Sequence, residues 1–91
     1  MVTDVPMESP NFSIFIHSMA QQALMGLGLA PWPDSGSVEA RLDVAREMIE
    51  ILAMLQEKTK GNLTPDEERL VTTLIYELRM VYVEKMAQKS S

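Results

Sequence analysis

The sequence contains no cysteine, and this absence removes several classes of function at once. Without cysteine the chain has no disulfide, no thiolate zinc ligand and no thiol nucleophile. Such a composition suits a reducing compartment, so we expect a cytoplasmic protein. Its 91 residues are enough for one small domain with a modest core.

Basic residues are scarce, with 8 Lys and Arg against 13 Asp and Glu, a formal net charge of −5. No Lys or Arg precedes Arg41. Because an acidic chain repels nucleic-acid phosphates and anionic lipids, we expect no nucleic-acid partner. Residues 1–10 are acidic, contain prolines and lack the basic start and apolar segment of a signal peptide. We expect them to form a disordered N-terminal tail.

Residues 9–33 lack charged side chains altogether, yet they do not form a clean membrane-spanning run. Asn11, His17 and Gln21 interrupt the apolar residues, and a helix lying on a membrane would normally carry Lys or Arg on its polar face. We therefore expect no membrane partner. The segment predicts a helix over about 11–27 that is largely covered by protein, for which a second copy of the chain is one candidate.

The segment EKTKGNLTPDEE, residues 57–68, has the features of a joint between two helices. Thr64 can cap the second helix and Glu67 can return the bond in a capping box, with proline at the first helical position. Before the joint, cations suit the last turn of a helix, and Gly or Asn can adopt the left-handed conformation that ends it. A phosphate-binding loop needs two glycines, separated by four residues, before its lysine. The single glycine of this segment follows both lysines. A DNA-reading helix would not open with three carboxylates. The residues assigned to the joint and its caps are Lys58, Lys60, Gly61, Asn62, Thr64, Pro65 and Glu67.

Apolar residues at three- and four-residue spacing predict two further helices, over about 38–60 and 65–88. Because the turn between them is short, these two helices should fold back as an antiparallel helical hairpin. The predicted fold is all-α, with a single three-helix domain over residues 11–88 and a frayed C-terminus over 89–91.

The last predicted helix carries a second apolar strip, on a different face from its main apolar stripe. A helix with two apolar faces needs two partners, and soluble monomers seldom expose large apolar patches. Together with the apolar side of the first helix, this surplus predicts a protein-interaction module that self-associates, most simply as a homodimer, or that binds an unidentified protein partner. The residues assigned to the possible interface are Phe12, Phe15, Ile16, Met19, Ala23, Tyr76, Met80 and Val83.

The side chains that usually carry catalysis are not grouped in this sequence. His17 is the only histidine, has no carboxylate near it on its own helix and belongs to no zinc-binding spacing, so we interpret it as structural. We expect no enzyme activity, no metal and no cofactor. The eight methionines leave an alternative function open, a carrier of a small apolar ligand in a Met-rich pocket between helices. Trp32, between two prolines, is interpreted as a lid over the core rather than as an anchor for a partner. Thr59 has no evident role.

The stretches FSIFIHSMAQQALMGLGLAP and LDVAREMIEILAMLQEKTKGNLTPDEERLVTTLIYELRMVYV resemble a family of small bacterial proteins defined by a domain of unknown function, number 1844. The joint EKTKGNLT is the most specific part of the resemblance, which covers about residues 12–83. Glu50 stands where the family pattern usually has Asp. The resemblance implies a bacterial, cytoplasmic, all-helical protein and supplies no activity. The remaining matched positions are Phe12, Phe15, Ser18, Ala20, Ala23, Leu27, Gly28, Ala45, Ile49, Leu52, Met54, Leu55, Leu78, Arg79, Tyr82 and Val83.

Overall fold

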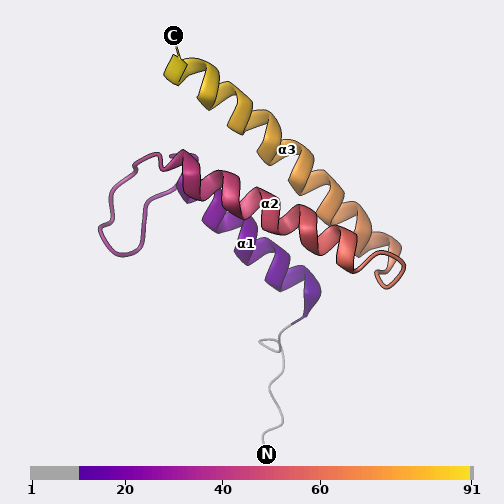
Figure 1. Ribbon diagram of the computed structural model, residues 1–91. Coiled ribbons are helices and arrows are strands. Elements are labelled where there is room, and N and C mark those ends of the chain that lie inside the picture. Colours follow the sequence, from indigo (N-terminus) through magenta and orange to yellow (C-terminus); the bar gives the residue numbers. More distant parts are fainter. Residues whose placement is uncertain (1–10, 91) are drawn as a thin grey trace, which may run out of the picture.

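The computed structural model describes residues 11–90, which form three α-helices and no strand. Helix α1 spans Phe12–Gly26, α2 spans Leu42–Lys58 and α3 spans Pro65–Ser90. In Figure 1, α2 lies between α1 and α3, and α3 extends well past the start of α2. The all-α class predicted from the sequence is confirmed. The predicted N-terminal tail and residue 91 lie outside the described residues, and α3 remains helical at Lys89 and Ser90, where fraying was expected.

Helix α1 begins and ends at the residues that the sequence favours. The Asn11 side chain accepts a 2.9 Å hydrogen bond from the Ile14 amide and so caps the first turn. At the other end Gly28 has a φ of 79°, a left-handed conformation that glycine adopts without strain. There the Leu29 amide donates to the Leu24 carbonyl at 2.9 Å and satisfies one of the free carbonyls of the last turn.

Helix α2 begins at Leu42 rather than at about residue 38, because the preceding residues are bonded elsewhere. The Arg41 amide donates to the Gly26 carbonyl at the end of α1, at 2.8 Å. The Trp32 indole N–H donates to the Glu39 carbonyl at 2.7 Å. These two bonds hold Arg41 against α1 and Glu39 against Trp32. The helix therefore starts only after Arg41.

The joint between α2 and α3 has the capping geometry predicted from its sequence. The Glu67 amide donates to Thr64 Oγ1 at 3.1 Å, and Glu67 Oε1 accepts from the Thr64 amide at 2.9 Å. Gly61 has a φ of 86°. Thr59, which had no evident role, lies at the C-cap of α2 and donates its hydroxyl to the Leu55 carbonyl at 2.6 Å. The capping-box bonds and the left-handed glycine are therefore present, while α2 itself ends at Lys58, where Thr59 closes its last turn.

The two helices joined by this turn lie alongside each other. Gln56 Nε2 donates to Thr72 Oγ1 at 2.9 Å near the turn, and farther from it Ile49 and Tyr82 border one groove. Helix α3 therefore runs back along α2. The core between the three helices consists of apolar side chains, and its buried members are Ile16, Met19, Ala20, Ala23, Leu27, Ala45, Ile49, Leu52, Val71, Ile75 and Leu78.

Candidate functional site

The outer face of α3 carries a row of exposed apolar side chains on the side away from the core. Tyr76 is 64% exposed, Met80 51% and Val83 65%. Ala87 continues the row, so its members follow one another at intervals of four, three and four residues. Such spacing keeps side chains on one stripe of a helix. We call these four residues the α3 stripe.

The residues of α3 that face the other way fill the core. Val71, Ile75 and Leu78 are all buried, at 5% exposure or less. The prediction that this helix has two apolar faces is therefore confirmed by the burial of one set and the exposure of the other. Since α1 and α2 occupy only the first face, nothing among the described residues covers the α3 stripe.

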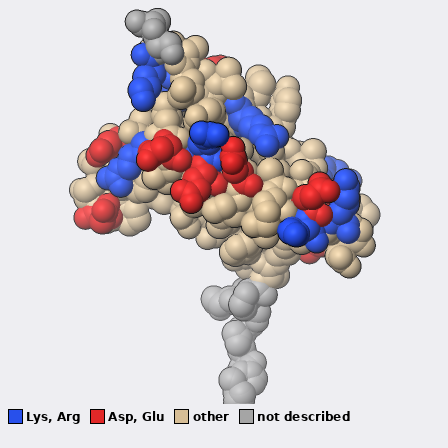
Figure 2. All heavy atoms as spheres, in the orientation of Figure 1, with Lys and Arg blue, Asp and Glu red and all other residues tan. Residues whose placement is uncertain are grey.

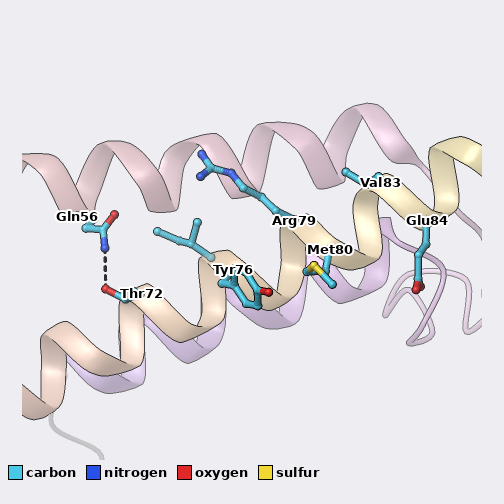
Figure 3. A pocket seen from close by; sticks show the side chains of 8 residues that line it. Gln56, Thr72, Tyr76, Arg79, Met80, Val83 and Glu84 are labelled. Carbon is cyan, nitrogen blue, oxygen red and sulfur yellow. Dashed lines mark hydrogen bonds between the residues drawn. The ribbon is translucent and has the colours of Figure 1, made fainter.

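A shallow groove of about 500 Å³ runs beside the stripe, between α3 and the end of α2. Tyr76, Met80 and Val83 contribute apolar walls, and the hydrogen-bonded pair of Gln56 and Thr72 closes one end (Figure 3). The groove is open to solvent along its length. It can therefore accommodate a side chain or a helix of another protein more readily than it can enclose a small molecule.

Charges of opposite sign flank the stripe. Figure 3 shows Arg79 extending toward α2 and Glu84 extending in the opposite direction, with Tyr76 and Met80 between them. Glu77 lies one heptad before Glu84 and therefore on the same flank. All three charged side chains are exposed, and none of them forms an ion pair within residues 11–90. Their charges remain free to meet a partner.

The residues of α1 that were assigned to the interface divide between core and surface. Ile16, Met19 and Ala23 are buried at 0%, 9% and 0% exposure and pack inside a single chain. They are therefore not available to a second chain, and we remove them from the interface. Phe12 is half-buried against the core, whereas Phe15 is 49% exposed. The sequence could not separate these residues because the side of α1 that α2 covers is set by the packing of all three helices.

The exposed side of α1 is the part of the surface that the sequence-based assignment missed. Ile14 is 48% exposed and lies with Phe15, Gln21 and Gln22 on the outer side of the helix. In Figure 2 the charged side chains gather over α2 and near the α2–α3 turn, whereas the surface over α1 shows none. The signal was present in the sequence, since Ile14 falls opposite the apolar residues that became buried.

Trp32 holds together the connection between α1 and α2 and does not cover the core. The Arg41 guanidinium lies 4.1 Å from the centroid of the indole ring, a cation–π contact. The Trp32 ring is half-buried and is not among the side chains packed against the core. The interpretation of Trp32 as a lid over the core is therefore corrected: the ring holds its own loop together.

Residues 9–84 match the family described as a domain of unknown function (DUF1844). The chain belongs to this family. The resemblance noted in the sequence is thereby confirmed, and the matched range contains α1, α2 and most of α3, including Tyr76, Met80 and Val83. No curated protein and no solved structure matches this DUF1844 chain significantly.

Histidine and acidic side chains are the groups of this DUF1844 domain that metal binding or proton transfer would use. The His17 side chain is exposed rather than structural and has no hydrogen bond to another residue between 11 and 90. Within the same range, no three His, Asp or Glu side chains are grouped closely enough to hold a metal ion. None of the described helices is long and apolar enough to cross a membrane. The most distinctive surface of the domain is thus the α3 stripe.

Proposed function

We propose that this DUF1844 protein is a non-catalytic protein-interaction module that self-associates, most simply as a homodimer, through the α3 stripe. The observation that carries the proposal is the row of three large apolar side chains exposed on the side of α3 opposite the core. The lack of cysteine and the net charge of −5 further support a cytoplasmic setting without nucleic-acid or membrane partners, and the family resemblance implies a bacterial one.

The gain from covering this row comes from the hydrophobic effect. Burial of apolar surface contributes about 25 cal/mol per Å², and each member of the row has about half or more of its surface still in water. A second protein surface would bury them at little cost, because the row has no charged member. Contiguous exposed apolar side chains of this kind mark interaction sites on soluble proteins.

The shape of the domain supports the same function. The Cα radius of gyration is 15.0 Å, whereas a compact domain of this length has about 12 Å. The Cα extents of 52 × 32 × 16 Å describe a thin, elongated body. A thin body buries few residues in its own core, and docking a second chain on its open side would complete the burial.

The test compares two methionines of similar exposure. Met80→Glu places a charge in the α3 stripe, where we expect it to shift the protein from dimer to monomer. Met54 is 46% exposed on α2, among the acidic residues, and Met54→Glu is the matched control that should leave the dimer intact. Light scattering after gel filtration gives the mass, and circular dichroism checks that both variants remain helical. A monomeric parent protein, or a folded Met80→Glu variant that is still dimeric, would contradict the proposal.

The second candidate function is a carrier of a small apolar ligand, and the groove of about 500 Å³ beside the stripe favours it. Its volume is within the range of ligand pockets, but a ligand there would remain open to water on one side. Of the methionines between residues 11 and 90, only Met19 is buried, which leaves no Met-rich interior in that part of the chain. Native mass spectrometry of the protein from its own source separates the candidates: a bare dimer mass supports self-association, and added small-molecule mass supports the carrier.

A further inference from the structure

We infer that the second copy docks with its α3 parallel to the first α3, in register, so that Arg79 of each chain meets Glu84 of the partner subunit. This inference rests on the proposed function, since it presupposes self-association through the α3 stripe. It adds the orientation of the two chains and the residues that select it. The heptad position of each side chain around the stripe supports this arrangement.

The stripe has the spacing of a two-helix seam. Tyr76, Met80, Val83 and Ala87 alternate by four and three residues, as the a and d positions of a coiled coil do. With Met80 at a and Val83 at d, Arg79 falls at position g, and Glu77 and Glu84 fall at position e. Helix α3 is 26 residues long, about 39 Å, and is long enough to carry this seam from Tyr76 to Ala87.

The flanking charges distinguish the two possible orientations. In a parallel pair the g flank of one helix faces the e flank of the other, which places Arg79 against Glu84 of the partner subunit, twice by symmetry. In an antiparallel pair like flanks face each other, and Glu77 would lie near Glu84 of the partner subunit. Two acidic contacts repel, whereas two Arg–Glu contacts attract. The charges therefore favour the parallel arrangement.

The occupant is a second copy of this chain because the face complements itself. Its two flanks carry opposite charges, and Arg79, Glu77 and Glu84 lack ion-pair partners within residues 11–90. A two-fold axis along the seam brings each flank to the opposite flank of the other copy. The apolar stripe between them meets itself at the centre.

The first experiment uses single cysteines, which are unambiguous because the chain has none of its own. Thr73→Cys and Ala87→Cys each place one cysteine at heptad position a, at opposite ends of the seam. In a parallel pair each variant should form a disulfide with its own copy under mild oxidation, since like residues face each other. In an antiparallel pair the like residues are at least about 16 Å apart along the axis. A disulfide needs Cα atoms within about 7 Å of each other.

The second experiment reverses the charges. Arg79→Glu and Glu84→Arg should each weaken dimerisation roughly tenfold in analytical ultracentrifugation, because two attractive contacts become repulsive. The double variant should recover the parent affinity. Glu77→Arg is the matched control: in a parallel pair residue 77 faces Thr72 of the partner subunit and the change has little effect. In an antiparallel pair Glu77→Arg would tighten the dimer.

These results separate the inference from the proposed function. Disulfides at both positions, with recovery in the double charge variant, support the parallel pair. A dimer by light scattering that forms no disulfide at either position, or that tightens with Glu77→Arg, overturns the orientation and leaves self-association standing. A parent protein that is monomeric overturns both.

Discussion

Gly26 and Ala45 are in direct contact where α1 ends and α2 begins. A Cβ atom placed on Gly26 would lie 2.8 Å from the Ala45 amide nitrogen and 3.1 Å from the Ala45 Cβ. Both residues are buried, and the Gly26 carbonyl accepts the hydrogen bond from the Arg41 amide at 2.8 Å. Because Gly26 has no side chain, the two helices can approach this closely. The Gly26 carbonyl also fixes the position of Arg41, directly before the start of α2.

The first prediction is that Gly26→Ala destabilises the domain by about 1–3 kcal/mol, the usual cost of overpacking a tight contact. The added methyl group meets backbone atoms, which cannot move aside as the end of a flexible side chain can. Urea unfolding followed by circular dichroism measures the loss. Ser18→Ala, on the exposed side of the same helix, is the control and should change stability little. Equal midpoints for the two variants would show that the approach of the helices is not limited by Gly26.

The second prediction concerns the capping box at the start of α3. Thr64→Ala removes the hydroxyl that accepts the Glu67 amide at 3.1 Å, and we expect a loss of about 1 kcal/mol in unfolding free energy. Thr64→Ser keeps the hydroxyl and should retain most of the stability. A Thr64→Ala protein that unfolds at the same urea concentration as the Ser variant would mean that the cap contributes nothing.

The capping box could be predicted because all its atoms belong to residues 64–67 and their geometry depends on local sequence alone. The beginning of α2 could not be predicted in the same way. It depends on the bond from the Arg41 amide to Gly26, which joins residues far apart in the sequence. A helix pattern in the sequence carries no record of such a bond.

The candidate interface, too, could be predicted from the sequence only where it depends on the spacing within one helix. The two faces of α3 followed from spacing, because a long helix with two apolar stripes shows both in its sequence. On α1 the spacing marked one apolar side, but Phe15 at its edge is half exposed while neighbouring Ile16 is fully buried. The boundary between core and surface on that helix is set by where α2 crosses it, close to Gly26 and Ala45.

The third prediction tests the role assigned to Trp32. Trp32→Phe keeps an aromatic face for the Arg41 guanidinium but removes the indole N–H that donates to the Glu39 carbonyl at 2.7 Å. We expect faster amide hydrogen exchange at Gly36 and Arg41, whose amides are bonded within this connection or across it to α1. Exchange at the buried Val71 should not change, because Val71 lies near the start of α3, whereas the connection borders the opposite end of that helix. Uniformly faster exchange would instead mean that Trp32 stabilises the whole domain.

The fourth prediction compares adjacent residues of α1 that were assigned together from the sequence. Ile16 is fully buried in the core, so Ile16→Ala should lower the free energy of unfolding by about 2–5 kcal/mol. Phe15 is 49% exposed, and Phe15→Ala should cost clearly less, although phenylalanine is the larger side chain. Urea unfolding at one protein concentration gives both values. If Phe15→Ala were the more damaging change, the covered side of α1 would have to include Phe15, either through a different helix packing or because a second chain buries the ring. Light scattering distinguishes these explanations, since only the latter releases monomers.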